Sequence, residues 1–585
     1  MRMSAPAVDL RLRRAGFDSF RPWPWIALIL VALAVATPLA FLLLGSFSTS
    51  TLPSEFTWQS LGLVNYARVW LDPDTYEVAG NTFVYVLGTM AFGLGLAVLL
   101  AFLVERTDLP GRLFLYAGIP MTLAMPGMLQ AMAWVLMFSP RIGFLNLAAR
   151  WLLGLDAMPF NIYSMGGMIF VEGLRLVPTA FLMLVPLLRA MDPALEEAAS
   201  VSGARPAATL RRVTARLLLP GLAAAAIYLG MTALEVFEVP GVLGLPAGIH
   251  VFSTRIYAAV HAATGDPDYG RADALAILYV LLAILATALY ARIIRRAERF
   301  AMVSGKGYRP RRVALGRWRW PAATFAFLYL GLAILLPFLV LLYISFLPFL
   351  QAPSAAALRL FTLSNYRQLW NNELIGTALA NTAIMVLVTA TATVLVSLAI
   401  ALIVVRSKFA ARKLLDQLTF LPHAIPGIVL GLAFFWLFLV IDRIGLAVGG
   451  GVLAISIAFT VAFMAYGTRA LSAALLQIHR DLEEAARTSG ASSWRVTCRI
   501  FTPLILPAMA GLWIWAVLHA VRQAGAPLIL ADGPDNQVLA VLIWNLWSHG
   551  GIPVVGALGT LMILAMLLVA LALRLLGFGR ESGRG

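Results

Sequence analysis

The sequence predicts an all-α polytopic membrane protein with about twelve transmembrane helices, built as two parallel six-helix repeats. The 585 residues are 61% hydrophobic and only 12% charged, with a mean hydropathy of +0.87. Soluble domains are about 45–50% apolar and about 25% charged, so the composition alone indicates a membrane protein. The number of long apolar segments and the recurrence of motifs at a fixed spacing supply the rest of the prediction.

Twelve segments have the length and composition of membrane spans, since a helix needs about 20 mostly apolar residues to cross a bilayer. They lie at approximately 24–46, 79–104, 113–138, 163–189, 216–237, 274–294, 320–347, 377–405, 413–440, 451–475, 503–524 and 552–577. None alternates polar and apolar residues as a membrane β-strand would. The first segment is too long for a signal-peptide core and lacks a small-residue cleavage site, so we expect it to be a retained span.

The formal charge of +16 is distributed unevenly along the chain. If the N-terminus lies in the cytoplasm, only 8 of the 44 Lys and Arg residues fall in outer loops. Basic residues concentrate in cytoplasmic loops, so both termini are expected to be cytoplasmic. The densest basic stretch, 295–319, is expected to lie near anionic lipid headgroups rather than to bind nucleic acid.

Several motifs of the first half return in the second half 300 residues later, as a search for internal repeats shows. The matching stretches are NYARVW at 65–70 and NYRQLW at 365–370, Asn81-Thr82 and Asn381-Thr382, and MPGMLQAMAWVLMF at 125–138 and IPGIVLGLAFFWLF at 425–438. A polar insert at 195–220 also matches one at 482–507 without a gap, at an offset of 287. The first half therefore holds about 13 extra residues, which we place in an outer loop around Asn146 to Asn161.

Six spans per half is an even number, so both halves are expected to insert the same way up. Such repeats are related by a pseudo-twofold axis along the membrane normal. The predicted organisation is a cytoplasmic N-terminal segment, a first repeat, a basic cytoplasmic linker, a second repeat and a cytoplasmic tail, at 1–23, 24–294, 295–319, 320–577 and 578–585.

The two polar inserts each lie between the fourth and fifth span of their half, where a cytoplasmic loop is expected. Both open with Leu-Glu-Glu-Ala-Ala, which favours a helix, and Gly203 and Gly490 can supply the left-handed residue that ends it. The acidic pair lies near the helix N-terminus, where the macrodipole favours anions. Pro220 and Pro507 stand about where the next span should start.

Glu-Ala-Ala, three residues and then Gly resembles the EAA loop of binding-protein-dependent ABC importer permeases. Both copies keep this spacing, although Thr502-Pro503 and Ala215-Arg216 stand where the family has Leu-Pro. The resemblance implies a type I ABC importer permease fold in which each loop forms a coupling helix that docks on an ATPase subunit. The residues it assigns to coupling are Glu196, Glu197, Ala198, Ala199, Gly203, Glu483, Glu484, Ala485, Ala486 and Gly490.

The resemblance also implies a translocation subunit rather than an enzyme, located in the bacterial cytoplasmic (inner) membrane. Its implied partners are two copies of a cytoplasmic ABC ATPase, a periplasmic or extracellular substrate-binding protein and the lipid bilayer. No GxxxxGK[ST] phosphate loop and no cluster of His or Cys ligands occurs, and Cys498 is the single cysteine. We therefore expect no cofactor and no metal on this chain, and ATP with Mg²⁺ on the ATPase subunits.

Three stretches, 237–257, 421–432 and 526–547, resemble the fused permeases of ferric-iron importers. Permeases for thiamine, 2-aminoethylphosphonate and polyamines are close relatives, so these cargoes are alternatives to ferric iron. Ferric iron favours carboxylate and phenolate ligands, and no intramembrane cluster of them is evident, which leaves a chelated ion open. The resemblance implies transport by alternating access. An ion-coupled secondary transporter is the alternative from another class, and a non-transporting scaffold or sensor is a third.

Ionisable residues within the predicted spans are candidates for the translocation pathway or its gate, because such groups are costly in a bilayer. They are Glu172, Arg175, Glu235, Glu238, His423, Arg469 and Arg522. Glu172 and Arg175 are spaced to neutralise each other on one helix face. Glu235 and Arg522 are equivalent at the offset of 287, and we expect them to face each other across the repeat axis near the outer gate. His423 has the alternative role of a packed core histidine.

Overall fold

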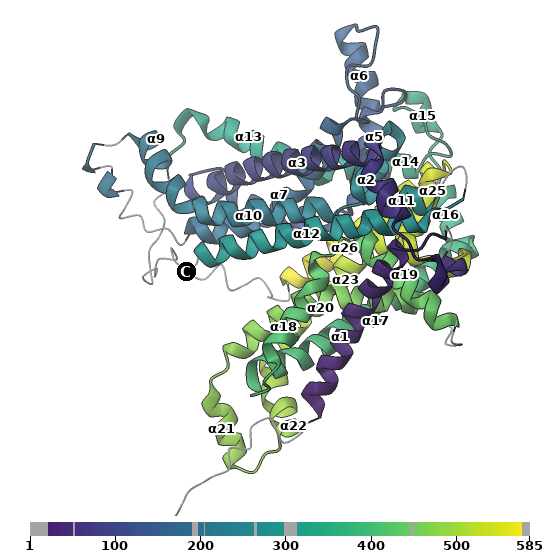
Figure 1. The fold of residues 1–585 in the computed structure, drawn as a ribbon. Coiled ribbons are helices and arrows are strands. Elements are labelled where there is room, and N and C mark those ends of the chain that lie inside the picture. The colour runs from purple at the N-terminus through teal and green to yellow at the C-terminus, as the bar shows by residue number, and fades with distance from the viewer. Residues whose placement is uncertain are drawn as a thin grey trace, which may run out of the picture. The chain divides into compact units, whose positions relative to one another are not determined.

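The computed structural model describes residues 22–50, 53–189, 197–199, 201–203, 205–261, 266–297, 313–443, 445 and 450–575. Over these ranges the regular elements are all helices, and extended pairing is limited to two isolated β-bridges. Figure 1 shows long helices joined by short helical segments. The predicted all-α fold class is confirmed.

The helices are described here by their labels in Figure 1. Those of the first half are α1 (Trp23–Ser46), α2 (Val64–Leu71), α3 (Pro73–Arg106), α4 (Arg112–Met121), α5 (Gly127–Phe138), α6 (Phe144–Leu153), α7 (Met165–Arg189), α9 (Pro206–Thr209), α10 (Ala215–Glu235), α11 (Phe252–Val260) and α12 (Tyr269–Ala297). Those of the second half are α13 (Arg319–Leu330), α14 (Leu336–Ser345), α15 (Ala355–Arg359), α16 (Ser364–Asn371), α17 (Glu373–Arg406), α18 (Arg412–Phe420), α19 (Gly427–Arg443), α20 (Val452–Leu476), α21 (Arg480–Thr488), α22 (Ser493–Val496), α23 (Thr502–Arg522), α24 (Gly525–Leu530), α25 (Leu539–Ser548) and α26 (Ile552–Leu575).

The chain divides into two compact units. The smaller unit comprises residues 1–37, 388–423 and 460–516, and the larger unit comprises 38–387, 424–459 and 517–585. The units do not coincide with the two predicted repeats, because long helices such as α17 and α23 contribute to both units. The limits of the repeats stay a prediction from the sequence.

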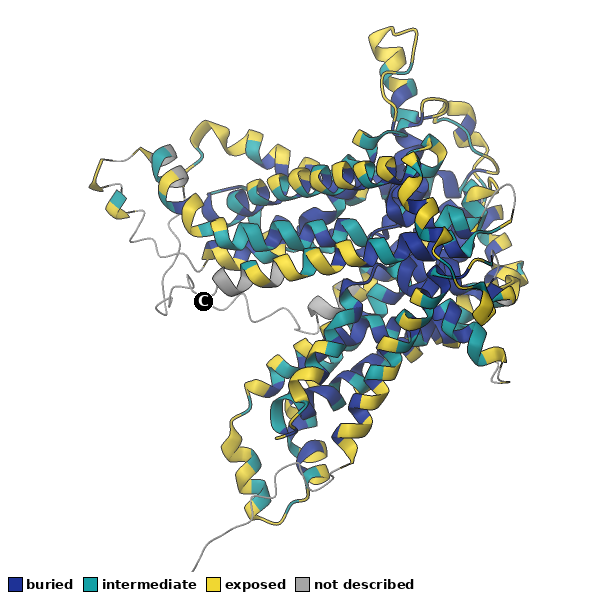
Figure 2. Ribbon diagram, viewed as in Figure 1, coloured by how far each residue is buried: buried dark blue, intermediate teal, exposed yellow. Residues whose placement is uncertain are grey.

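In the larger unit, α3, α7, α10 and α12 lie side by side (Figure 1). Gly93 of α3 and Gly173 of α7 let these two helices approach closely, since a Cβ on Gly93 would lie 3.0 Å from the Gly173 carbonyl oxygen. Small residues are the usual means of close helix packing in membranes. Figure 2 shows that buried and exposed residues alternate along such helices, so each has one packed face and one outward face.

Ten helices of the described ranges are long and apolar enough to cross a membrane, or up to 12 if each of two bent pairs counts as one span. The bent pairs lie at the predicted spans 113–138 and 413–440, and each of these spans is broken into two helical segments. In the first, the chain turns by 97° between Arg112–Ala124 and Gly127–Phe138. The breaks fall at Pro126 and Pro426, because proline lacks an N–H and excludes the residue before it from helical geometry.

The extra residues of the first half form α6 and the chain around it, in the loop where the sequence placed them. The amide of Asn146 is fully buried and donates to the carbonyls of Phe138, Ser139 and Phe160, at 3.0, 3.1 and 2.7 Å. The Asn146 carbonyl oxygen accepts from the Phe160 N–H at 3.1 Å. The Asn146 side chain therefore connects the two ends of the insertion, at residues 138–139 and at residue 160, by hydrogen bonds.

Matching hydrogen bonds in the larger unit support the internal repeat. The Asn65 amide donates to the carbonyls of Ser46 and Ser48, at 3.2 and 2.5 Å, just beyond the end of α1. Asn365 makes the same pair of bonds just beyond α14, at 2.9 and 2.7 Å. The shared NY motif thus satisfies carbonyls left free where the first span of each half ends.

The repeated Asn-Thr motif has an equally specific role. The Thr82 hydroxyl oxygen accepts from the Phe252 N–H at 3.1 Å, and that of Thr382 accepts from the Leu539 N–H at 2.7 Å. Phe252 and Leu539 are the first residues of α11 and α25. Each threonine therefore caps the short helix that lies between the fifth and sixth spans of its half.

The buried Asn365 amide gives a testable prediction. Replacing Asn365 with Ala leaves buried carbonyls without a donor, which costs about 1–3 kcal/mol. We expect the midpoint of thermal unfolding in detergent to fall by several degrees. Asn371→Ala is the control, since Asn371 is an exposed asparagine of the same helix. Equal midpoints for the two variants would contradict the capping role.

Candidate functional site

The second polar insert folds as the sequence predicts, into a short helix followed by a sharp turn. The α21 helix begins after His479, whose side chain accepts from the Asp481 N–H, and it ends at Thr488. Gly490 takes the left-handed conformation, with φ at 82°. The Ala491 N–H donates to the Ala486 carbonyl at 3.0 Å, which is the bond of a Schellman C-cap.

Glu483 is held by two arginines of its own unit. The Arg487 guanidinium lies 2.7 Å from one carboxylate oxygen, and that of Arg406 lies 3.6 Å from the other. Arg406 ends α17 and also donates to the carbonyls of Leu475 and Ile478, at 2.6 and 2.7 Å, beyond the end of the α20 ladder. The Arg406–Glu483 contact therefore joins the α21 helix to the C-terminal ends of two long helices, α17 and α20.

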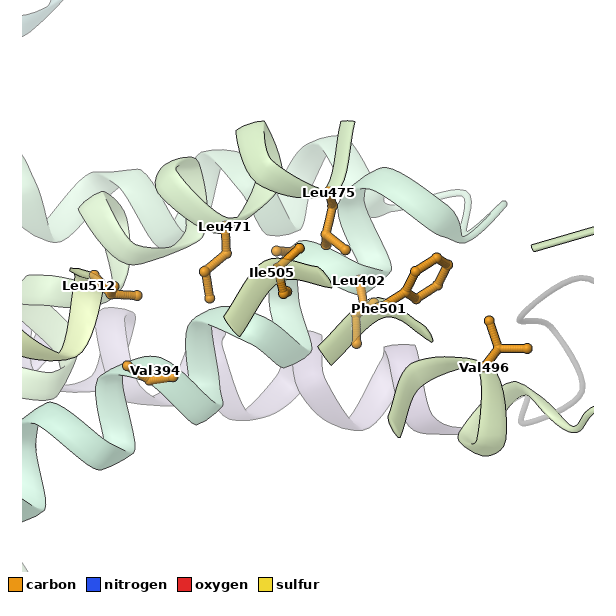
Figure 3. Packing of buried hydrophobic residues seen from close by; sticks show 9 residues of the cluster. Val394, Leu402, Leu471, Leu475, Val496, Phe501, Ile505 and Leu512 are labelled. Atoms are coloured by element: carbon orange, nitrogen blue, oxygen red, sulfur yellow. The ribbon is translucent and has the colours of Figure 1, made fainter. Parts of the chain in front are cut away.

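A hydrophobic core lies behind this loop (Figure 3). Its buried members come from α17, α20 and the chain that runs from α22 into α23: Val394, Ala401, Leu402, Leu471, Leu475, Val496, Phe501, Ile505 and Leu512. Ala486 of α21 packs against it, and Arg406 lies over the Phe501 ring at 5.0 Å. The α21 helix is therefore packed against α17, α20 and α23 through this core.

The outward face of the loop carries an acidic residue among apolar ones. Glu484 and Ala485 are exposed, and Leu482 and Trp494 are 50% and 76% exposed. The two adjacent glutamates therefore differ, since Glu483 is turned toward the chain and Glu484 toward the outside. An exposed acid beside exposed leucine and tryptophan side chains is typical of a protein interface.

The first polar insert is described only in part. Glu196 lies outside the described residues, whereas Glu197, Ala198 and Ala199 are helical, and Gly203 has φ at 81°. The left-handed glycine therefore occurs in both copies at the predicted position.

The chain that follows each glycine has the same local structure at the 287 offset. A short helix at 206–209 and a wide π-helical turn at 210–214 lead into α10. In the second half the same succession occupies 493–496 and 497–501 and leads into α23. Because each long helix begins five residues before its proline, Pro220 and Pro507 lie inside the helices rather than at their starts. Local π-helical adjustment is one way in which membrane helices accommodate proline.

Glu172 and Arg175 form the expected pair on α7. The Arg175 Nε and Nη2 atoms donate to the two oxygens of Glu172, at 2.9 and 2.5 Å. Glu172 is fully buried, so the two-point contact supplies the compensation that a buried carboxylate requires.

Glu235 and Arg522 do not form the expected pair, and no ion pair between them occurs among the described residues. They end α10 and α23. Arg522 instead donates to the carbonyl of Leu123, which lies at the break of the bent third span, where the helix ladder leaves acceptors free. Glu238 accepts from the Ala524 N–H at 3.2 Å. The repeat in the sequence shows that Glu235 and Arg522 are equivalent. It does not show that the broken third span leaves the Leu123 carbonyl free to accept from Arg522.

His423 and Arg469 both contact Phe420 in the smaller unit. The His423 ring lies 5.6 Å from the Phe420 ring, and the Arg469 guanidinium lies over that ring at 4.2 Å. His423 is half-buried, immediately before the break at Pro426. These contacts fit the packed-histidine alternative.

The sequence analysis missed three buried polar features. Arg106 and Arg406, 300 residues apart, end α3 and α17 and are buried, so their equivalence was available as a signal. Asp273 is fully buried in α12 and accepts from the Trp436 Nε1–H at 2.7 Å. An aspartate within an apolar segment is itself a signal, although its tryptophan partner was not foreseeable.

The third missed feature is an aromatic pair formed by equivalent residues. Trp544 lies 287 positions after Tyr257, and its Nε1–H donates to the Tyr257 hydroxyl at 2.9 Å. Burial raises the pKa of the Tyr257 phenol, so at neutral pH the hydroxyl keeps its proton. Tyr257 lines a cavity of about 280 Å³ together with residues that include His261, Gln537 and Asn545. Residues of both halves therefore meet at one small polar cavity.

The contact between Arg406 and Glu483 gives a second prediction. In the variant Arg406→Ala, the Leu475 and Ile478 carbonyls lose their donor and the α21 helix loses its link to α17. We expect trypsin to cleave within 480–499 about tenfold faster, since each unsatisfied buried group costs about 1–3 kcal/mol. Arg412→Ala, which removes a bond to the Ser407 carbonyl, is the control. An unchanged cleavage pattern in the Arg406 variant would contradict this role.

Comparison with known proteins places these features in a family. The family model described as binding-protein-dependent transport system inner membrane component matches residues 393–578, which include α21 and the chain after it. The ferric transport system permease protein FbpB of Actinobacillus pleuropneumoniae is 27% identical over 493 residues, covering 84% of this chain and 69% of that protein. The Fe(3+)-transport system permease protein FbpB 2 of Haemophilus influenzae is 21% identical, covering 90% and 93%.

Permeases named for other cargoes also match. The sulfoquinovosyl glycerol transport system permease protein SmoG of Agrobacterium fabrum is 30% identical over 279 residues, which cover 46% of this chain and 89% of that protein. Permease proteins of sulfate and spermidine/putrescine transport systems match over shorter stretches. The apolar helices, the repeated glycine turns and these relatives agree, and the chain belongs to the family of binding-protein-dependent transport system inner membrane components.

Proposed function

We propose that the chain is the membrane-spanning permease subunit of an ATP-driven, binding-protein-dependent ABC importer whose cargo is ferric iron. The observation that carries the permease role is the duplicated coupling loop. Each copy has helical residues at its Glu-Ala-Ala, a left-handed glycine, a short second helix and a π-helical turn that continues directly into a long apolar helix. One chain thus supplies two docking points, one for each of two ATPase subunits.

The contacts of the second loop suggest how a force on it would reach the membrane. A partner that grips the exposed Glu484, Leu482 and Trp494 would move α21. The Glu483–Arg406 contact and the core around Phe501 would then carry that movement to α17, α20 and α23. A basic residue on the ATPase suits Glu484, since charge-assisted bonds to carboxylates are strong.

The transport cycle that we propose is alternating access. ATP and Mg²⁺ are held by the ATPase subunits, and this chain contributes the pathway and the two loops. Closure of the ATPase pair would move both loops and rock the two repeats about their common axis. A loaded binding protein on the outer face would bias the same equilibrium, and that coupling is reciprocal. In this arrangement the membrane is the bacterial inner membrane and both termini are cytoplasmic.

Ferric iron is favoured as cargo because relatives named as ferric permeases match over most of the chain. Within the described residues, no group of three or more His, Cys, Asp or Glu side chains could hold a metal ion. A pathway without a tight site suits transport, since an ion must leave as readily as it enters. We infer that selection of the cargo, bare or chelated, takes place in the separate binding protein. Polyamine is the second candidate cargo, because a spermidine/putrescine permease also matches.

Replacing Glu197 and Glu484 together with Ala tests the permease role. We expect ⁵⁵Fe uptake by cells to fall to background and the ATPase subunits to be lost during purification, because both loops lose their outward carboxylate. Asp481→Ala is the matched control, as it removes an exposed acid of the same α21 helix. Normal uptake and normal ATPase recovery in the double variant would contradict the proposed permease role. Uptake that persists without ATP would favour an ion-coupled secondary transporter.

Competition tests the cargo separately. In cells that express the whole transporter, we expect uptake of ⁵⁵Fe³⁺ to be unaffected by a large excess of unlabelled spermidine, thiamine, 2-aminoethylphosphonate or sulfate. If spermidine competes and itself accumulates, polyamine is the cargo, while the permease role stands. The Glu197/Glu484 variant, which is defective whatever the cargo, is the background control.

A further inference from the structure

The larger unit carries an apolar groove that the proposed transport function does not use. It lies between the first turns of α4 and α13 and has a volume of about 450 Å³. Its lining residues are Pro110, Gly111, Trp320, Ala323, Thr324, Phe327 and Leu328. Apart from the Thr324 hydroxyl these side chains are apolar, so the groove suits a hydrocarbon.

The groove exists because one half lacks an aromatic ring that the other half has. In the smaller unit, the Trp25 ring of α1 packs edge-on against Phe409 at 5.0 Å. Ser46 ends α1 and Ser345 ends α14, so equivalent positions near these ends differ by 299. The π-helical turn Gly331–Leu335 holds one additional residue, so the difference is 298 for positions before that turn. The counterpart of Trp25 is therefore Ala323 or Thr324, and both of these small residues line the groove.

The walls of the groove are fixed by contacts of their own. The Phe114 and Phe327 rings stack at 5.8 Å between α4 and α13. Gly111 has φ at 70°, and a Cβ there would lie 2.8 Å from the Phe327 ring. The groove is thus a preformed feature of these two helices.

The C-terminal end of the basic linker, at 313–315, is also hydrogen-bonded to the first half beside the groove. The Val313 N–H donates to the Arg106 carbonyl at 2.8 Å, and the Leu315 N–H donates to the Asp108 carboxylate at 2.9 Å. These bonds place the start of α13, and the residues just before it, next to the Pro110–Gly111 turn.

Three arginines flank the lining residues. Arg112 follows Gly111 at the start of α4, and Arg317 and Arg319 precede Trp320. Among the described residues none of the three arginines has a carboxylate partner. Arg412, the counterpart of Arg112, donates to the Ser407 carbonyl at 3.1 Å. Asp108, the nearest acid in sequence, already accepts a backbone N–H. The lining residues are therefore flanked in sequence by three arginines and one aspartate, which gives this region a net positive charge.

Two tryptophans mark this region as the membrane–water interface. Trp318 and Trp320 are 62% and 72% exposed. Exposed tryptophan is typical of the headgroup level of a bilayer. An apolar groove, a net positive charge and an aromatic belt thus coincide at one place in the fold.

We propose that this groove binds one anionic phospholipid, with an acyl chain along Ala323, Thr324 and Phe327 and its phosphate at Arg112, Arg317 and Arg319. Basic pockets between helices at the cytoplasmic side are suited to anionic headgroups. The acyl chain fills the space that Trp25 fills in the other half. The lipid would stabilise the junction where the linker passes into the second repeat. This site is independent of the cargo and of the ATPase.

Native mass spectrometry of the full chain tests the site. The protein is released from nanodiscs that hold equal amounts of phosphatidylglycerol and phosphatidylethanolamine with identical acyl chains. We expect the wild type to retain one phosphatidylglycerol in preference to phosphatidylethanolamine. The double variant Arg317→Gln, Arg319→Gln should lose about 30-fold in apparent affinity, since each basic residue near an anionic surface contributes roughly fivefold.

Two further variants separate the headgroup from the acyl chain. Thr324→Trp restores a ring like Trp25 at an exposed position, so it should abolish retention while the arginines remain. Arg412→Gln removes the arginine that already has a backbone partner, and it should behave as the wild type. Size-exclusion chromatography establishes that each variant is folded. Equal retention of the two lipids by the wild type, unchanged retention by Thr324→Trp, or a polypeptide in place of the lipid would overturn the proposal.

Discussion

The constraint on which this structure depends is that a bilayer offers no hydrogen bonds to the backbone. Helices satisfy their own N–H and C=O groups, and every departure from a straight helix must find a substitute partner. Asn65 and Asn365 supply donors where the first span of each half ends, and Thr82 caps α11. Arg522 serves a carbonyl freed where the third span breaks. These polar residues therefore lie where helices stop or bend.

The sequence predicted the helices and the helix–glycine turn of the second polar insert, because each depends on a local pattern. The spans were predicted from the length of the apolar segments. The end of α21 was predicted from Gly490, because glycine readily takes the left-handed conformation that ends a helix. The break at Pro126 has a local signal in the proline itself, but the spans were predicted from apolar length, which does not show a break. The different surroundings of Glu483 and Glu484 could not be read from adjacent identical residues. They depend on Arg406, which lies 77 positions before Glu483 in sequence.

The two halves share a plan but differ where their counterparts are compared atom by atom. Tyr257 and Trp544 are equivalent, yet one accepts and the other donates in the bond between them. Glu235 and Arg522 are equivalent and opposite in charge, and Arg522 meets a backbone carbonyl, for which a carboxylate would be unsuited. In a symmetric dimer of identical chains such changes would have to occur twice. Fusion into one chain permits each half to specialise at a single position.

This asymmetry extends to the chain around the two polar inserts. In the second copy, α21 is joined to α17 and α20 through Arg406 and packs on the core around Phe501. Arg106 occupies the corresponding end of α3 and is as deeply buried, so the first half has the means for the same connection. What differs is the chain after the loop, where Ala215-Arg216 replaces Thr502-Pro503. The two inserts therefore continue into their long helices through different residues, so a chain that carries both copies can make the link at this point unequal.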